Sequence, residues 1–409
     1  MESILGIISF LVTFNLTIGI SYLILPLRKI LIIAFLLRAS SAFINYYIVL
    51  LPDGRADAIT FEQTAWQWSQ NGFWKTFQHF DLTGSYVYSF LLSIPYSLLG
   101  RSPLMAQSIN VALGILIVWS GYKLALLLWG QKSAVCAAWL IAVFPTLVMY
   151  SSVTLREVWI VLPFMIGLIC VVKWYQTNKH QYIIGGFISF ITSAIFHGAM
   201  IFAFLIFLLL VSSKLFKQLI TKISRDRIPV TKTCILILIF SGAAFVLANN
   251  ELFTLSKVEQ ITNSQTEIIE VLQHVSLDRS RGTAAYLVGI KLENLYDLIW
   301  YVPLKVIYFL FSPFLWNLKS VSHLIGLVDS LFYVLIFFSL LKKYKNPILR
   351  QKYSAVIIII ISMIVIFSLG TGNFGTAIRH RAKFAPALLS VCSLCKTKRA
   401  KYFCSIQKH

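Results

Sequence analysis

The chain has 409 residues, of which 58% are hydrophobic and 12% are charged, and its mean hydropathy is +0.79. A typical soluble domain carries roughly 25% charged residues, and a water-soluble fold could not bury this much apolar surface, so that class is excluded. A formal net charge of +21 would suggest a nucleic-acid partner in a soluble protein. Here the positions of the charges along the chain give a simpler explanation, and we expect no nucleic-acid partner.

Repeated apolar runs near 20 residues long predict an all-α fold, a polytopic membrane bundle rather than a barrel. The first run ends at Arg28-Lys29 without a small-residue cleavage site, which indicates a span and not a signal peptide. We expect eleven spans, at about 3–25, 30–50, 104–128, 133–150, 158–175, 181–196, 198–213, 233–249, 321–341, 354–370 and 383–395.

The charged residues sort by side of the membrane. Lysine and arginine gather in the short loops 28–29, 214–232, 342–352 and 396–408, which the positive-inside rule places in the cytoplasm. Most acidic residues fall in the other loops. We therefore expect an integral multi-pass protein of the bacterial inner (plasma) membrane, with an outer N-terminus, a cytoplasmic C-terminus and an extracytoplasmic active site.

The outer segments are where we expect function to lie: 51–103, 151–157, 250–320 and 370–383. Two apolar stretches within them, 86–99 and 303–316, contain prolines and are predicted to be interfacial helices rather than crossings.

Asp57 is the first candidate catalytic residue. It follows the second predicted span, and positions 57, 61 and 65 share one face of a helix, so its carboxylate would head an apolar stripe packed on the bundle. A carboxylate held there can serve as a general base. The alternative is a helix N-cap or a solvated loop acid.

Glu157 is the second candidate, at the outer end of a predicted span. An acid there is also explained by the helix dipole, with Arg156 as its partner. A functional role for Glu157 is favoured by its predicted position, because Asp57 and Glu157 come from separate segments and would both lie at the same face of the membrane.

An ordered series of short elements resembles the membrane-embedded GT-C glycosyltransferases, which include protein mannosyltransferases and lipid A aminoarabinose transferases. The series covers roughly two fifths of the chain, and no single element of it is specific. Its elements are Asp57-x3-Phe61-x3-Ala65, Leu98-Leu99-Gly100, the span from Leu104, Trp129-Gly130, the run from Ala137 to Pro145, Tyr150-Ser151-Ser152, Arg156-Glu157 and His197-Gly198.

The resemblance implies an inverting transferase that moves a sugar from a polyprenyl-phosphate carrier to a glycan, lipid or protein acceptor, in exopolysaccharide or surface-glycan synthesis. Asp57 corresponds to the catalytic base or acceptor-orienting group, and Glu157 to the acid of the next outer loop. Departures from the family are an extra N-terminal span, Glu rather than the frequent Asp at 157, and His197 in place of the usual lysine. The chain then divides into a two-span segment (1–50), a GT-C-like catalytic module (51–213) and C-terminal spans with a substrate-binding outer loop at 250–320 (214–409).

Basic residues should surround the phosphate, because a phosphate leaves readily once its charge is neutralised. Residues 379–381 could instead anchor the last span at the membrane interface, and residues 279 and 281 could instead pair with acidic residues of their own loop. A divalent cation shared by Asp57 and Glu157 is left open. The candidate phosphate- or substrate-binding residues are Arg156, His197, Arg279, Arg281, Arg379, His380 and Arg381.

Two charges inside predicted spans, Arg38 and Asp329, need partners. Their similar depths predict an ion pair between them. The six cysteines fall in spans or on the cytoplasmic side, so no disulfide framework is expected.

Two other functions fit parts of the pattern. An O-antigen or exopolysaccharide repeat-unit polymerase or ligase would use the outer arginines to hold a diphosphate and would not need Asp57 with Glu157. A lipid-linked oligosaccharide flippase or other transporter would want polar residues along several spans and two similar halves, and this chain has few intramembrane charges and no evident repeat.

Overall fold

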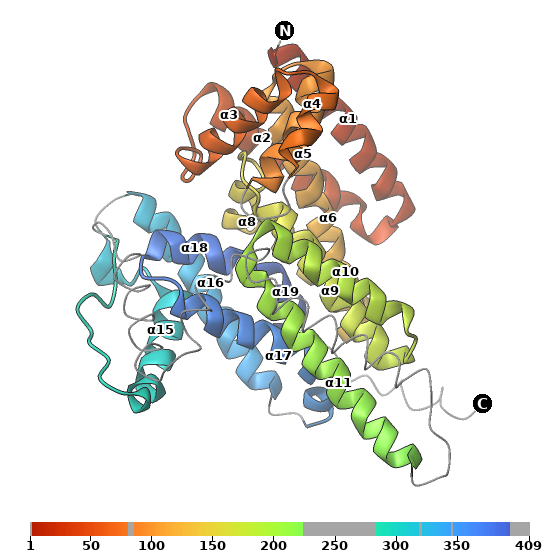
Figure 1. The fold of residues 1–409 in the computed structure, drawn as a ribbon, viewed down its shortest axis with the longest axis vertical. Helices are drawn as coiled ribbons and strands as arrows, with labels where there is room; N and C mark the ends of the chain where they lie inside the picture. The colour runs from red at the N-terminus through yellow and green to blue at the C-terminus, as the bar shows by residue number, and fades with distance from the viewer. Residues whose placement is uncertain (1, 81–85, 224–283, 319–320, 345–346, 393–409) are drawn as a thin grey trace.

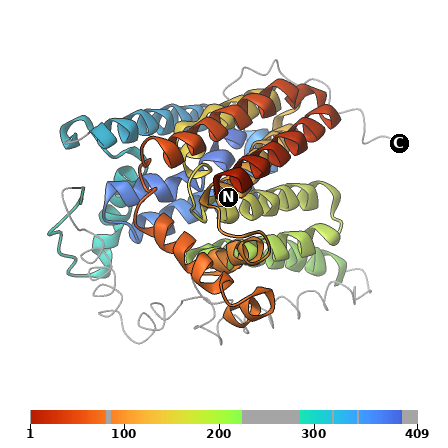
Figure 2. The same ribbon diagram turned by 90° about the horizontal axis from the view of Figure 1, so that it is seen from above.

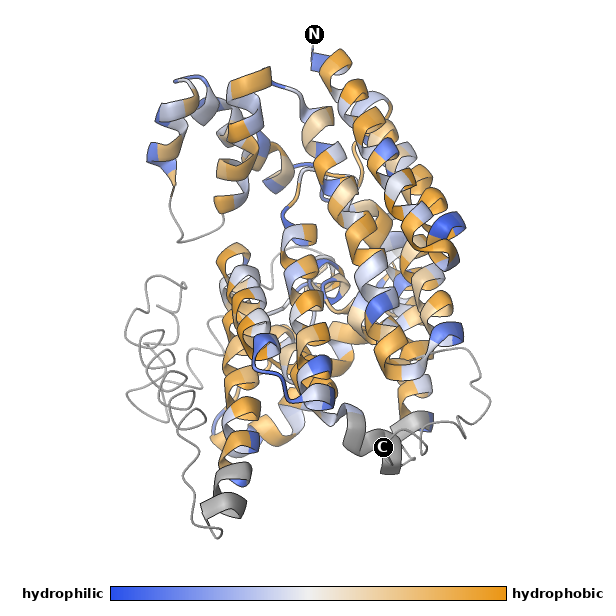
Figure 3. Cartoon of the chain, turned by 90° about the vertical axis from the view of Figure 1, so that its right-hand side faces the viewer, coloured by the Kyte–Doolittle hydropathy of each residue, from blue (hydrophilic) through white to orange (hydrophobic). Residues whose placement is uncertain are grey.

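A computed structural model describes residues 2–80, 86–223, 284–318, 321–344 and 347–392. Within them the fold is all-α, with sixteen α-helices and one isolated bridge between Ala285 and Asn373. Four helical stretches are long and apolar enough to cross a membrane: 2–23, 103–129, 157–177 and 198–217. Apolar residues predominate along the long helices of the molecule (Figure 3). The all-α class is confirmed and the membrane assignment is supported, while the number of eleven spans stays a prediction.

Most helices overlap the predicted apolar runs. In chain order they are α1 (Glu2–Leu23), α2 (Arg28–Tyr47), α3 (Asp57–Ser69), α4 (Phe73–Thr76), α5 (Val87–Leu99), α6 (Pro103–Trp129), α7 (Gln131–Val143), α8 (Pro145–Tyr150), α9 (Glu157–Thr177), α10 (Gln181–Phe196), α11 (Ile201–Ile223), α15 (Leu298–Phe311), α16 (Val321–Tyr344), α17 (Pro347–Leu369), α18 (Phe374–Ala382) and α19 (Ala385–Cys392). Helices α11 and α17 extend beyond the predicted spans 198–213 and 354–370, and α15 begins five residues before the predicted interfacial stretch 303–316. The predicted span 233–249 lies outside the described residues.

Helices α3, α4 and α5 lie together at the end of the molecule that carries the N-terminus, opposite the far end of α11 (Figure 1). Seen from that end, they lie to one side of α1 and α2 (Figure 2). Helix α6 runs through the packed interior, where small residues let its neighbours approach. A Cβ on Gly121 would lie 2.1 Å from Ile141 Cδ1. Close approach at glycine is typical of helix pairs in membranes.

One predicted span differs from the structure, and another is described only in part. The span 133–150 is broken between α7 and α8, because Pro145 has no N–H to continue the helix and occupies the first position of α8. The predicted span 383–395 is described only as far as Cys392, as α19, and residues 393–395 lie outside the described residues. Helix α19 follows α18 after a two-residue turn.

The predicted ion pair between Arg38 and Asp329 is wrong. Arg38 is buried, and its guanidinium donates to the carbonyl oxygens of Ala142 at 2.8 Å and Ile141 at 3.2 Å. These carbonyls are left over where α7 ends before Pro145, so Arg38 caps that helix. The cysteine expectation also fails at one position, since Cys136 is disulfide-bonded.

Candidate functional site

Arg379 joins the two carboxylates that the sequence singled out. Its Nη1 lies 2.6 Å from Asp57 Oδ2, and its Nε lies 2.6 Å from Glu157 Oε1. The Asp57 side chain is 57% exposed, that of Arg379 is 17% exposed and that of Glu157 is 4% exposed. Three segments far apart in sequence therefore meet at one cluster, with its open side at Asp57 and its buried side at Glu157.

The ends of three helices set these positions. Asp57 and Glu157 are the first residues of α3 and α9, where the helix dipole favours a negative charge. Arg379 lies in the last turn of α18, where the dipole favours a positive charge. Burial alone would lower the pKa of Arg379, but the charges of Glu157 and Asp57 outweigh it and hold that pKa well above its usual value. The guanidinium therefore stays charged.

A second layer of basic groups lies behind the cluster. Lys383 Nζ is 3.4 Å from Glu157 Oε1 and 2.8 Å from His380 Nδ1. The His380 ring meets the His197 ring edge to face, with 5.4 Å between their centroids. Burial, followed by the charges of Lys383 and Arg156, holds the pKa of His197 well below its usual range, so that its ring is neutral.

Arg156 completes this layer. Its guanidinium lies over the Phe61 ring, 5.6 Å from the centroid. Phe61 is a buried residue of α3, the helix whose first residue is Asp57. Among the described residues, the buried Nε of Arg156 and the buried Nδ1 of His197 have no hydrogen-bond partner. Both groups therefore have unused polar capacity beside the carboxylates.

A cavity of about 680 Å³ opens beside Asp57 and Arg379. Its polar lining comes from Asp53, Arg55, Asp57, Thr146, Tyr150 and Arg379, and its apolar lining includes Leu50, Met149, Phe374 and Ile378. The mixture suits a ligand with both polar and apolar faces. Glu157 does not line this cavity and lies behind Arg379, so it can act on a ligand there only through that side chain.

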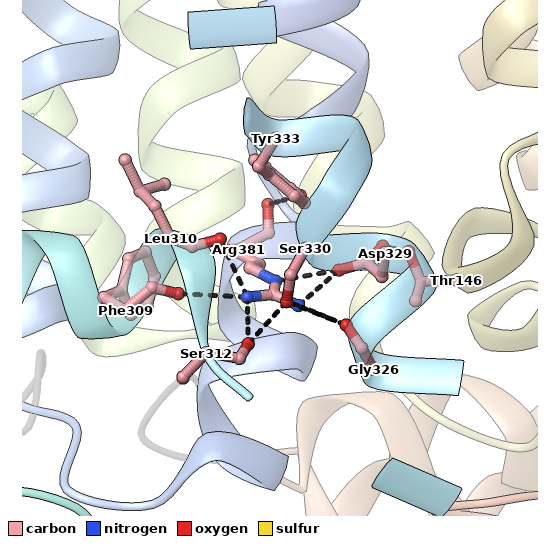
Figure 4. Close-up of polar contacts among 9 residues, drawn as sticks. All are labelled: Thr146, Phe309, Leu310, Ser312, Gly326, Asp329, Ser330, Tyr333 and Arg381. Carbon is pink, nitrogen blue, oxygen red and sulfur yellow. Dashed lines mark hydrogen bonds and ion pairs between the residues drawn. The ribbon is translucent and has the colours of Figure 1, made fainter. Parts of the chain in front are cut away.

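Arg381, two residues after Arg379, has a different role. It is fully buried and forms an ion pair with Asp329, 2.7 Å from Nη2 to Oδ2. The same guanidinium donates to the carbonyl oxygens of Leu310 at 2.9 Å and Ser312 at 2.6 Å (Figure 4). Its donors are thus engaged by protein oxygens at the junction of α15, α16 and α18, and Arg381 itself does not line the cavity.

The other predicted site residues are placed as follows. Arg156, His197 and His380 belong to the layer around Glu157, whereas Arg279 and Arg281 lie outside the described residues. In the described part of the chain, no three His, Cys, Asp or Glu side chains are grouped to hold a metal ion, and a cation shared by Asp57 and Glu157 stays an open prediction.

Three residues of the site were not among the site residues predicted from the sequence: Asp53, Tyr150 and Lys383. Tyr150 donates a 2.9 Å hydrogen bond to Asp53 Oδ2 in the cavity wall. Asp53 is one of several acidic residues of the outer segment 51–103, and its place four residues before Asp57 could have marked it. No pattern in the sequence brings Tyr150 or Lys383 to these carboxylates.

No family model matches the chain, and neither the curated proteins nor the solved structures give a match. The geometry of the described residues is therefore the basis for the function proposed below.

Proposed function

We propose that the protein is a membrane glycosyltransferase that moves a sugar from a polyprenyl-phosphate carrier to a glycan, lipid or protein acceptor, with inversion. The observation that carries the proposal is the Arg379 bridge between Asp57 and Glu157 at the edge of a mixed polar and apolar cavity. This displacement needs a carboxylate to orient or deprotonate the acceptor hydroxyl and a fixed cation to stabilise the leaving phosphate, and here the two lie side by side.

Arg379 is the group proposed for the phosphate. A guanidinium binds phosphate oxygens through several donors in a fixed plane, and Arg379 lines the cavity. Arg156 and His197 lie behind it with buried nitrogens that have no partner among the described residues. In this proposal the charge that develops on the departing phosphate is met by Arg379, with Arg156 and Lys383 adding to the positive field.

The two carboxylates differ in role. Asp57 is exposed to the cavity and is assigned to orienting the acceptor hydroxyl, as the resemblance to the GT-C enzymes implies. Glu157 is buried and contacts both Arg379 and Lys383. We assign it to positioning, because it fixes the direction in which the Arg379 guanidinium points.

The experiment is sugar transfer by purified protein in lipid, supplied with a panel of polyprenyl-phosphate and polyprenyl-diphosphate sugars. Wild type is compared with Asp57→Asn, Arg379→Ala and Glu2→Gln, the last being a matched acid-to-amide change at the exposed first residue of α1. We expect wild type to turn over a monophosphate donor. Asp57→Asn and Arg379→Ala should lose most of this turnover, and Glu2→Gln should keep all of it. Failure of every monophosphate donor would refute the proposal.

A repeat-unit polymerase or ligase is the second candidate, and the position of Arg379 in the cavity favours it equally. Such an enzyme would turn over only diphosphate-linked oligosaccharides. It would keep its activity in Asp57→Asn and lose it in Arg379→Ala, so the same set of variants separates the two functions.

A further inference from the structure

Asp53 is a second carboxylate in the cavity wall. Its Oδ2 accepts a 2.9 Å hydrogen bond from the Tyr150 hydroxyl, and both side chains line the cavity that Asp57 and Arg379 share. Within the described residues, no lysine or arginine forms an ion pair with Asp53. The cavity therefore holds one carboxylate bound by a guanidinium and one bound by a neutral hydroxyl.

The turn that carries Asp53 is held in an unusual shape. Asp53 and Ala56 have φ angles of 60° and 46°, in the region that favours glycine. Asn45 Oδ1 accepts a 2.9 Å hydrogen bond from the Leu51 N–H. A Cβ on Gly54 would lie 2.7 Å from the same oxygen. Strain of this kind persists only where the surroundings fix the backbone, so Asp53 and Asp57 are presented to the cavity by a rigid turn.

We propose that Asp53 is the base that takes the proton from the attacking acceptor hydroxyl, while Asp57 remains ion-paired with Arg379. This inference rests on the transferase function proposed above and assigns its proton transfer. The hydroxyl proton passes to the Asp53 carboxylate, and the acceptor oxygen forms a bond to the anomeric carbon. The bond from that carbon to the phosphate oxygen breaks, and its electron pair leaves with the polyprenyl phosphate beside Arg379.

The partners of the two acids decide which one is assigned to the proton. Asp57 Oδ2 lies 2.6 Å from a guanidinium that must stay in place for the phosphate. Protonating that oxygen would break the pair in which it holds Arg379. Asp53 accepts only from a phenol hydroxyl among the described residues, so it can gain a proton without releasing a cation from the site.

The charges around Asp53 support this assignment. Burial of the Asp53 carboxyl raises its pKa. The hydrogen bond from Tyr150 and the charge of Arg379 lower that pKa, the charges of Glu157 and Asp57 raise it, and the net result is a pKa above the usual value. A general base works best with a pKa shifted toward the working pH. These four groups come from α8, α18, α9 and α3, the elements that surround the turn.

The test is kcat as a function of pH for wild type, Asp53→Asn, Asp57→Asn and Tyr150→Phe, with Glu2→Gln as control. We expect Asp53→Asn to lower kcat by about 10²–10⁴-fold, the usual effect of a positioned base, while binding of a polyprenyl-phosphate sugar stays unchanged and the unfolding temperature does not fall. Tyr150→Phe removes a hydrogen bond that lowers the pKa of Asp53, so the acidic limb of its profile should move to higher pH.

Three outcomes would overturn the inference, and they are distinguishable. If Asp53→Asn keeps the kcat and the acidic limb of the wild type while Asp57→Asn loses both, Asp53 is not the base and the transferase function stands. If Asp53→Asn loses donor binding or unfolds at lower temperature, its role is structural. If wild type transfers no sugar from any donor, this inference fails together with the proposed function.

Discussion

Arg379 Nε and Glu157 Oε1 lie 2.6 Å apart although 222 residues separate them in the chain. The contact ties the last turn of α18 to the first turn of α9. Since Arg379 also reaches Asp57 at the start of α3, one side chain fixes three helix ends at the same place. The arrangement of the site thus depends on a buried ion pair as well as on apolar packing.

Removing the buried partner should be strongly destabilising. Glu157→Gln leaves Arg379 and Lys383 without their shared acid, and breaking one side of a buried pair costs about 3–5 kcal/mol. We expect a clearly lower midpoint of thermal unfolding in detergent or nanodiscs. Glu2→Gln, at an exposed position, is the matched control and should leave the midpoint unchanged. Equal midpoints for the two variants would show that the pair does not hold the helices together.

Arg381 should behave as a structural residue. Its guanidinium is fully buried and satisfies Asp329 and several carbonyl oxygens, so Arg381→Met leaves a buried carboxylate unpaired and should cost about 3–5 kcal/mol of stability. Arg381→Met combined with Asp329→Leu should regain part of the loss, because both charges are then removed. The measurement is the unfolding midpoint of each variant. A normal midpoint with weakened phosphate binding in Arg381→Met would instead place Arg381 in the substrate site.

Helical periodicity could have separated the two arginines in advance. Residues 379 and 381 are two positions apart, so on a helix of 3.6 residues per turn they point to nearly opposite sides. One side faces the acids of α3 and α9, and the other faces Asp329 in α16. The sequence predicts an outer segment without a helix at 370–383, and both arginines then belong to one cluster. The missing piece was the helix Phe374–Ala382, which is short and polar.

The sequence predicted the positions of helices better than the contacts between side chains that are distant in the chain. The start of α3 at Asp57 and the whole of α10 at 181–196 follow from local pattern alone, because an apolar face and a flanking turn define them. The partner of Arg38 did not follow, since depth in a membrane gives height and not the direction of a side chain around the helix. Tyr150 meets Asp53 only because Pro145 breaks the helix before it.

The stability of the protein should show the raised pKa of Asp53. Because the folded pKa lies above the unfolded value, the folded state binds the proton more tightly. The stabilising contribution is complete below the unfolded pKa and is lost as pH rises through the folded pKa. Asp53→Asn cannot titrate, so its unfolding midpoint should gain relative to wild type as pH rises through that window. The difference between the two midpoints against pH is the measurement, and a flat difference would contradict it.

A glycine in α6 tests how tightly the site is packed from behind. A Cβ on Gly114 would lie 2.8 Å from Ser151 Cβ and 3.0 Å from Arg38 Nε, and overpacking of this kind typically costs about 1–3 kcal/mol. A Cβ on Gly19 in α1 would meet nothing within 4 Å, so Gly19→Ala should be neutral or gain about 1 kcal/mol from helix propensity. We expect Gly114→Ala to lower the unfolding midpoint and Gly19→Ala to keep or raise it. If the two changes had equal effects, the packing beside Arg38 could shift to accommodate an added methyl group. Arg38 would then not be held rigidly against the end of α7.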